Sequence, residues 1–284
     1  IVCLPLSSCP NWPPFPYNSK IIKPFAMPYS HYKTFLAGLV ILSASLSSIA
    51  DQTPELPKGY TLQYEQSFQS KGAFKEFMMT DASAWGLLKK DGNTVLALQG
   101  ASDYEPPFRS PLNIALIKGM TFGDFVLDVD IQQSGVKGMP IAQFMKENPD
   151  LSIAGGYNHR DHCFFFGFQD PSHYMYIHIA KTGDNNAHNV FVVNESDRTP
   201  ITDFRTLGVD WGVEEWHKIR IVRDTAKGTV TLYFEDMLTP IMIADDVPFE
   251  QGFIGFGSFD DIGWVDNIRI YAPSATKTSK TFFE

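Results

Sequence analysis

Segments in which apolar and polar residues alternate recur along the chain, whereas the roughly 3.6-residue period of amphipathic helices is nearly absent. Turn-forming residues separate many of these segments, as at Asp91-Gly92-Asn93 and Lys227-Gly228. Strands are predicted over residues 62–68, 94–99, 113–117, 125–132, 163–169, 174–180, 190–193, 216–223, 229–234, 253–259 and 264–271, and one short helix over 141–148. Together with 14% aromatic residues, this pattern predicts an all-β fold, a two-sheet antiparallel jelly-roll sandwich.

Alternation also assigns side chains to faces of the predicted strands. In 125–132 the apolar residues face the core, so Asp128 and Asp130 point outward. In 174–180 the same rule puts Tyr174, Tyr176 and His178 on the face opposite the aliphatic residues. If both strands belong to one sheet, its outer face carries carboxylates, tyrosines and a histidine. Such a surface suits sugars, because aromatic rings stack on them while polar groups bind their hydroxyls.

The N-terminal 50 residues have the layout of an export signal. Met27 is the first methionine, Lys33 flanks the apolar run 35–46, and small residues at Ser48 and Ala50 suit a cleavage site. The run is too short to span a bilayer, so we expect no membrane anchor and a secreted or periplasmic protein. The expected organisation is upstream, non-native translation over 1–26, a signal peptide over 27–50, a single jelly-roll domain over 51–273 and a flexible tail over 274–284.

The expected mature chain is strongly acidic. Residues 1–50 contain Lys20, Lys23 and Lys33 and no acidic residue, so their removal takes the net charge from −9 to −12. An acidic surface argues against nucleic acid as a partner. The negative net charge also weakly disfavours polyanionic substrates, unless a local basic site attracts them despite it. Cys163 is the only cysteine left after cleavage, so an internal disulfide is excluded and we expect this thiol to be buried and inert.

Five of the seven histidines lie between positions 159 and 188. The ordinary histidine pKa lies near neutrality, so this window suits proton transfer or metal binding. His178 is the main candidate, because it shares a predicted face with Tyr176, and a His–Tyr pair can abstract and return a proton. Asp128 and Asp130, about 7 Å apart along a strand, are either the carboxylate pair of a glycosidase or plain solubilising groups.

The candidate residues form two sets. The catalytic candidates are His178, Tyr176, Asp128, Asp130 and His162, and the substrate-binding candidates are Tyr174, Arg160, Lys181, His188 and Arg198. His159 and His162 have the spacing of a metal pair, but they precede a strand, so metal binding and loop hydrogen bonding both stay open. Asp260 and Asp261 either rim the same groove or form a turn.

The second half of the chain carries recognisable strand motifs. Residues 216–224 (WHKIRIVRD) and 228–234 (GTVTLYF) resemble a strand pair of concanavalin A-like lectin/glucanase domains, and 255–261 and 265–271 resemble their last two strands. The chain is most similar to the bacterial 3-keto-disaccharide hydrolase-like domain over residues 60–272. This resemblance implies a jelly roll with carbohydrate as ligand, and it specifies the fold better than the activity.

The resemblance has two further consequences. In laminarinase-like relatives the aspartate at the position of Asp266 often binds a structural calcium, so Asp266 is a candidate calcium ligand here, or simply the cap of a strand end. The E-x-D-x-x-E catalytic strand of those glycosidases has no counterpart in this sequence. Their mechanism therefore does not transfer, and no cofactor is required apart from the candidate calcium.

Three functions remain open, all with an oligo- or polysaccharide as partner. The first is a glycan or disaccharide hydrolase that uses Asp128, Asp130 and His178 in one groove. The second is a polysaccharide lyase that uses Tyr176 and His178 with an arginine clamp from Arg160 or Arg198. The third is a carbohydrate-binding module without catalysis.

Overall fold

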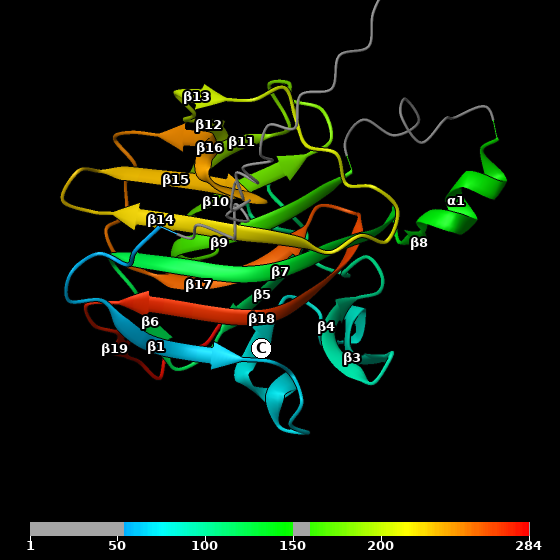
Figure 1. The fold of residues 1–284 in the computed structure, drawn as a ribbon, viewed down its shortest axis with the longest axis horizontal. Coiled ribbons are helices and arrows are strands. Elements are labelled where there is room, and N and C mark those ends of the chain that lie inside the picture. Colours follow the sequence, from blue (N-terminus) through cyan, green and yellow to red (C-terminus); the bar gives the residue numbers. More distant parts are fainter. Residues whose placement is uncertain (1–53, 150–159, 284) are drawn as a thin grey trace, which may run out of the picture. The chain divides into compact units, whose positions relative to one another are not determined.

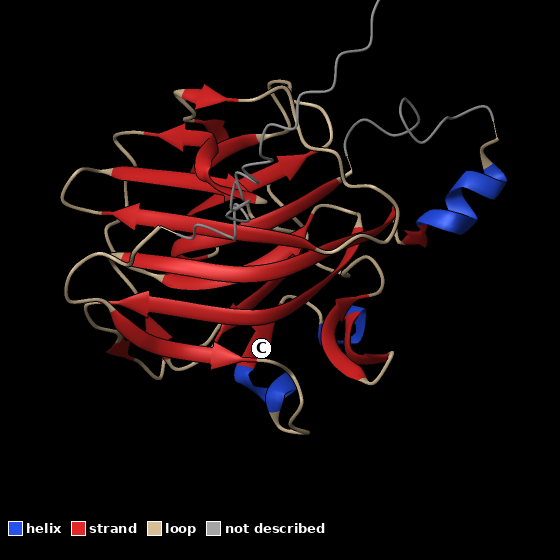
Figure 2. Ribbon diagram, in the orientation of Figure 1, coloured by secondary structure: helices blue, strands red, loops and turns tan. Residues whose placement is uncertain are grey.

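The computed structural model of the chain describes residues 54–149 and 160–283, so the predictions for residues 1–26 and 27–50 lie outside the described residues. Within that part, two large antiparallel sheets are stacked (Figures 1 and 2). This arrangement confirms the predicted two-sheet antiparallel jelly-roll sandwich. All eleven predicted strands are present, and the predicted helix is α1 (Ile141–Glu147).

Sheet A is the larger layer. In spatial order it consists of β13 (Phe204–Arg205), β16 (Asp236–Ala244), β15 (Thr229–Phe234), β14 (His217–Asp224), β7 (Phe125–Val136), β18 (Ile262–Ala272), β4 (Asn93–Leu98) and β3 (Trp85–Lys90). In addition, β1 (Thr61–Gln66) pairs with β18, and β8 (Met139–Pro140) pairs with β7. Figure 1 shows β7 and β18 side by side in the middle of this sheet.

Sheet B lies behind it. Its order is β12 (Thr199–Pro200), β11 (Asn189–Asn194), β10 (His173–Ala180), β9 (Asp161–Asp170), β17 (Phe253–Ser258), β5 (Asn113–Ile117) and β2 (Phe77–Met79). A small third sheet joins β6 (Met120–Thr121) to β19 (Thr276–Lys277), and two short 3₁₀ helices cover Ala73–Glu76 and Ala82–Ala84. None of the helices in the described ranges has the length and apolar content that crossing a bilayer requires.

The main core lies between the sheets and follows the predicted alternation. Its members include Leu127 and Val129 of β7, Ile219 and Ile221 of β14, Phe164 and Phe166 of β9, and Ile177 of β10. Strand β16 was not predicted, because Pro240 interrupts its alternation. Pro240 sits opposite Tyr233 where the register with β15 shifts, a place where the missing N–H is tolerated.

The outer face of sheet B is also buried, which the sequence did not predict. A second apolar cluster, called here the outer aromatic cluster, covers it and contains Met78, Ile114, Leu116, Cys163, Phe165, Phe168, Tyr174, Tyr176, Phe191, Val193 and Phe253. Phe168 lies on the same face as Phe165 because β9 bulges at Gly167, whose φ of +55° suits glycine and shifts the alternation.

Distant segments of the chain cover this cluster. Phe108, Phe259, Phe282 and Phe283 pack against it. The Phe282 ring centroid lies 5.3 Å from that of Phe168 and 5.6 Å from that of Phe253. The structure thus differs from the expected flexible tail over 274–284: β19 pairs with β6, and the two phenylalanines pack on sheet B.

We predict that Phe282→Ala lowers the free energy of unfolding by about 1–2 kcal/mol, somewhat less than for a fully buried phenylalanine because Phe282 is half-buried. Chemical denaturation checks this value, with Leu207→Ala as a neutral control since Leu207 is 92% exposed. Equal stability of both variants would show that the tail does not cover the sheet.

Candidate functional site

The structure separates the predicted catalytic residues onto two sheets. Asp128 and Asp130 lie on β7 and point outward from sheet A, while Tyr176 and His178 lie on β10 and point outward from sheet B. These two faces are on opposite sides of the sandwich. The expected single groove with Asp128, Asp130, Tyr176 and His178 therefore does not form.

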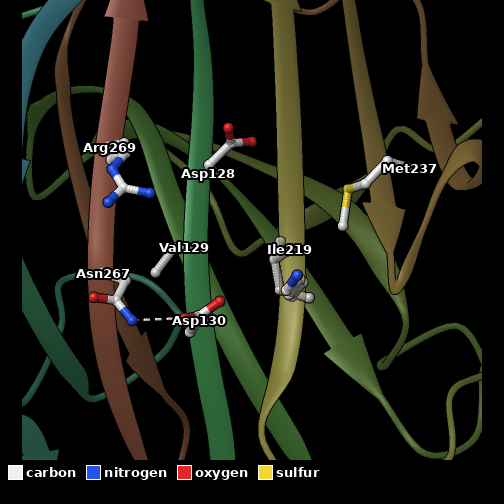
Figure 3. A pocket seen from close by; sticks show the side chains of 8 residues that line it. Asp128, Val129, Asp130, Ile219, Met237, Asn267 and Arg269 are labelled. Carbon is white, nitrogen blue, oxygen red and sulfur yellow. Dashed lines mark hydrogen bonds between the residues drawn. The ribbon is translucent and has the colours of Figure 1, made fainter. Parts of the chain in front are cut away.

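The aspartate pair lines a cavity of about 350 Å³ on sheet A, together with Met237, Asn267 and Arg269 (Figure 3). Asp128 is held in a two-pronged ion pair with Arg220, with both oxygens 2.6 Å from guanidinium nitrogens. Asp130 accepts a hydrogen bond from Asn267 Nδ2 at 2.8 Å. Because Arg220 balances the charge of Asp128 and holds both its oxygens, Asp128 is less available as an acid, base or nucleophile.

Tyr174 and Tyr176 occupy the predicted face, but they are buried in the outer aromatic cluster and do not form an open sugar platform. Tyr174 stacks on Phe168 at 4.8 Å, and Tyr176 stacks on Phe191 at 5.2 Å. Burial is the main reason why the pKa of both hydroxyls lies above the ordinary tyrosine value. Tyr176 is thus poorly suited to abstract a proton.

Arg160 and His188 were expected at the substrate groove, but both are buried structural residues. Arg160 donates from Nε to Gln133 Oε1 and from both terminal nitrogens to the Gly212 carbonyl oxygen. His188 Nδ1 accepts the Ala180 N–H, so its Nε2 carries the hydrogen and donates to Thr206 Oγ1 at 3.0 Å. Burial and the nearby Arg205 lower the pKa of His188 to about 4, so the ring is neutral at neutral pH.

The remaining histidine and lysine candidates also lie away from the groove. His162 is on the inter-sheet side of β9, 5.2 Å from the Phe164 ring, and burial lowers its pKa to about 4. Lys181 Nζ lies 3.6 Å from Asp210 Oδ1. His159, the first member of the candidate metal pair, lies outside the described residues.

Asp266, the candidate calcium ligand, is buried at the bulge of β18. Its Oδ2 accepts a hydrogen bond from Asn93 Nδ2, and its Oδ1 accepts one from the Asn267 N–H. Burial is the main cause that raises its pKa, with a smaller contribution from Asp130. Because both carboxylate oxygens of Asp266 already accept hydrogen bonds, the residue suits the alternative in which it caps a strand end. Calcium binding by Asp266 stays a prediction.

His178 and Arg198 do meet in one cavity, called here the His178 pocket. This cavity of about 270 Å³ lies on the outer side of sheet B and is lined by Arg109, Asp161, His178, Asn186, Ala187, Arg198, Phe259 and Asp260. A neighbouring cavity of about 320 Å³ shares Arg109, Phe259 and Asp260 with it. The two cavities therefore adjoin, with the Phe259 ring and two charged side chains at their boundary.

The register of β9 and β10 brings Asp161 and His178, which line the His178 pocket, next to Cys163. In the β9–β10 pair, His178 is opposite Cys163 and Ala180 is opposite Asp161. Cross-strand partners and every second residue share a face, so the Asp161, Cys163 and His178 side chains all point to the outer side of sheet B. All three are buried, and one ligand atom from each lies within 4.8 Å of the other two.

Hydrogen bonding fixes the proton on the His178 ring. Nδ1 lies 3.1 Å from the Asn186 carbonyl oxygen, which can only accept, so Nδ1 carries the hydrogen. Nε2 is buried without a hydrogen-bond partner, although Asp161 Oδ2 is only 3.1 Å away, because the direction between them does not suit a hydrogen bond. A buried carboxylate this close to a ring nitrogen without a hydrogen-bond partner is stabilised by positive charge placed between the two atoms.

Asp261 and Ser258 hold Asp161 in place. Asp261 Oδ2 accepts the Asp161 N–H and Asp261 Oδ1 accepts the Lys137 N–H, each at 2.9 Å, which ties the end of β7 to the start of β9. Ser258 donates a short hydrogen bond of 2.5 Å to Asp161 Oδ1. Burial, followed by the charge of Asp161, raises the pKa of Asp261 well above its ordinary value.

Two side chains at the mouth of the pocket are suited to bind and react. The Arg198 guanidinium lies 4.6 Å from the Phe191 ring centre and 4.3 Å from that of Phe259, and it donates to the Tyr176 hydroxyl at 3.1 Å. Asp260 is half-buried beside it. Burial and the nearby Asp161 raise the pKa of Asp260, which brings its titration closer to neutrality.

The sequence reasoning missed Asp161 and Arg109 and left Asp260 undecided. Asp161 could have been found from the turn at 169–172, because a hairpin turn fixes which residues of its two strands are opposite each other. The bulge at Gly167 shifts that register and hides the pairing. No local signal points to Arg109, which reaches the pocket from a segment without regular structure.

We predict that Asp261→Asn lowers the free energy of unfolding by about 2 kcal/mol, because the amide NH₂ would face a backbone N–H and leave a buried donor unpaired. Asp260→Asn is the matched control, since Asp260 is half-buried and adjacent; its stability should change little. Denaturation curves of both variants measure the difference. If the two variants were equally stable, Asp261 would not hold the strands together.

His188 predicts a pH dependence of stability. Its pKa is about 4 in the folded chain against 6.5 for an ordinary histidine, so the unfolded chain binds the extra proton between these values. This contribution to stability is fully present above pH 6.5 and is lost as the pH falls to 4, a change of up to about 3 kcal/mol.

His188→Asn should make the free energy of unfolding depend less on pH between 4 and 6.5. Asparagine is a suitable replacement because it tolerates the left-handed backbone at this position, where φ is +56°. Denaturation at a series of pH values compares the two proteins. An unchanged slope would mean that His188 does not titrate in this range.

Comparisons with known proteins leave the family open. No protein-family model matches the chain, and no curated protein matches it. Among solved structures it is similar to a carbohydrate-binding module from Bacillus subtilis, with a TM-score of 0.44, 12% identity, and coverage of 69% of this chain and 96% of the module.

Two other similar structures are a protein of unknown function with a galectin-like fold from Bacillus subtilis and a marine alginate lyase from Aplysia kurodai. The first has a TM-score of 0.45 and 14% identity, and covers 77% of this chain and 100% of its own. The second has a TM-score of 0.40 and 10% identity, and covers 74% and 98%. By their names, the module and the lyase bind or act on carbohydrate, but similarities this low carry no argument about the reaction of this chain.

Proposed function

We propose that this protein is a carbohydrate-active enzyme that binds a carboxylate-bearing saccharide in the His178 pocket and cleaves it by β-elimination. The observation that carries the proposal is the convergence of Arg198, Arg109 and Asp260 over the buried Asp161–His178 pair in one cavity. The lining holds the guanidinium groups of Arg109 and Arg198 as well as the carboxyl groups of Asp161 and Asp260. In a chain that is acidic as a whole, the two arginines offer an anionic ligand a place to bind.

Arg198 supports the binding of a carboxylate. A guanidinium is planar and matches a carboxylate with two parallel hydrogen bonds. The Tyr176 hydroxyl takes one of its five N–H donors, and the rings of Phe191 and Phe259 hold its orientation. Because the side chain is already ordered, binding loses little rotamer entropy. The exposed Arg109 adds a second positive charge at the same mouth.

Asp260 supports the proton-transfer step. In the elimination, a base removes the proton from the carbon that bears the carboxylate. The bond from the neighbouring carbon to the leaving sugar oxygen then breaks, a carbon–carbon double bond forms, and the oxygen takes up a proton. Asp260 lines both adjoining cavities, and its raised pKa suits a group that accepts and returns a proton. Arg198 would stabilise the charge that develops on the carboxylate.

Hydrolysis is the second candidate, because one specific observation favours it. Asp161 and Asp260 line the same pocket, and the charge of Asp161 contributes to the raised pKa of Asp260. Two carboxyl groups whose pKa values differ can serve as base and acid in glycoside hydrolysis. Asp161 is buried and already bonded to Ser258, which makes it less accessible than a hydrolytic base requires.

Product analysis tests the proposal. The chain is incubated with uronate-containing and neutral oligosaccharides, and ultraviolet absorbance and reducing ends are both measured. We expect absorbance from an unsaturated uronate with the acidic substrates only. New reducing ends without absorbance would indicate hydrolysis instead, and binding without any product would reduce the protein to a binding module.

Matched variants locate the site. Asp260→Asn should lower kcat by about 10²- to 10⁴-fold, the usual contribution of an acid–base group. Arg198→Lys should mainly raise KM, because lysine keeps the positive charge but cannot form the two parallel hydrogen bonds to a carboxylate. Asp130→Asn, the same chemical change on sheet A, should leave both constants unchanged. If kcat fell equally in Asp130→Asn and Asp260→Asn, the placement of the site in the His178 pocket would be contradicted.

A further inference from the structure

Three potential metal ligands of different kinds lie together beside the His178 pocket. Asp161 and His178, which line the pocket, offer a carboxylate oxygen and an imidazole nitrogen, and the neighbouring Cys163 offers a thiol sulfur. They come from two neighbouring strands in fixed register, and all three side chains are buried. Their ligand atoms lie within 4.8 Å of one another. A small movement of these side chains would bring them to a common centre.

His178 supplies the independent sign of a ligand. Its residue surface is only 3% exposed, and its Nε2 has no hydrogen-bond partner although it faces this cluster. Its Nδ1–H donates to the Asn186 carbonyl oxygen. A metal-binding histidine in proteins has this same arrangement, with one nitrogen fixed by a carbonyl or carboxylate and the other left free for the ion.

A proton alone accounts for less of this geometry than a cation does. A proton shared between His178 and Asp161 needs the ring N–H to point at Oδ2, and this direction is not satisfied at the 3.1 Å separation. In a tetrahedral zinc site with bonds of about 2.0 Å, two N or O ligands are about 3.3 Å apart, with no requirement that one point at the other. A cation would also involve the Cys163 thiol, which a proton shared between His178 and Asp161 does not.

We propose that Asp161, Cys163 and His178 bind one zinc ion beside the His178 pocket, which Asp161 and His178 line. Zinc accepts oxygen, nitrogen and sulfur ligands together, whereas calcium and magnesium prefer oxygen alone. Three protein ligands leave a fourth position, as in catalytic zinc sites. Asp161 and His178 line the same cavity as Arg198 and Asp260, so we expect the fourth position to open toward it, and this part of the inference rests on the proposed function. A saccharide carboxylate or hydroxyl is the expected fourth ligand.

Zinc titration of the full chain tests this site. The protein is stripped of metal with a chelator and titrated with Zn²⁺ alone by calorimetry, and we expect one ion per chain. Cys163→Ser and Asp161→Asn should each weaken binding by more than about 100-fold, since even loss of an outer-shell partner typically costs 10- to 100-fold. His188→Asn, a buried histidine outside the cluster, should bind zinc like the unaltered chain. Absence of saturable binding, or equal affinity in Cys163→Ser, overturns the proposal.

Cobalt spectroscopy keeps the test valid if a variant fails to fold. Co²⁺ in the unaltered chain should show a thiolate-to-cobalt charge-transfer band, and a bound-cobalt spectrum without that band overturns the site. Different results would contradict the proposed function and the proposed zinc site. Zinc binding at these residues without any saccharide cleavage contradicts the proposed function alone, and full cleavage by a chain that cannot bind zinc contradicts the metal site alone.

Discussion

Burial of sheet B on both faces determines which polar groups the molecule can hold there. The inner face packs on sheet A, and the outer aromatic cluster covers the other face under Phe259, Phe282 and neighbouring residues. A polar side chain in such a sheet needs partners, because no water reaches it. Near β10 the cover opens into the His178 pocket, which the polar side chains of Asp161 and His178 line. Polar groups of this sheet can meet a ligand there.

The same burial makes the Asp161–His178 pair informative. On an open surface, a carboxylate 3.1 Å from an imidazole nitrogen would need no special account. In this buried position, with the other ring nitrogen bonded to a carbonyl oxygen, positive charge between the two groups stabilises the pair. Arg198 and Arg109 add further positive charge at the mouth. We infer that the pocket suits an anion at its mouth and a cation beside Asp161 and His178, a combination that fits a carboxylate-bearing substrate.

Local patterns predicted the strands well and the site only in part. Alternation placed Tyr176 and His178 on one face correctly, since that face depends on β10 alone. It could not show that β7 and β10 belong to different sheets, because this depends on pairing between distant segments. It also could not show that Tyr176 is buried, since the cover comes from residues such as Phe259 and Phe282, far along the chain. Asp161 was hidden by the bulge at Gly167.

A crystal structure with a bound uronate oligosaccharide tests the central claim most directly, namely that function resides on sheet B at the His178 pocket. We expect a sugar carboxylate within hydrogen-bond distance of Arg198, with the glycosidic bond next to Asp260 and the saccharide continuing over Phe259 into the adjoining cavity. A saccharide bound instead on sheet A, at Asp128 and Asp130, with no sugar in the His178 pocket, would contradict it.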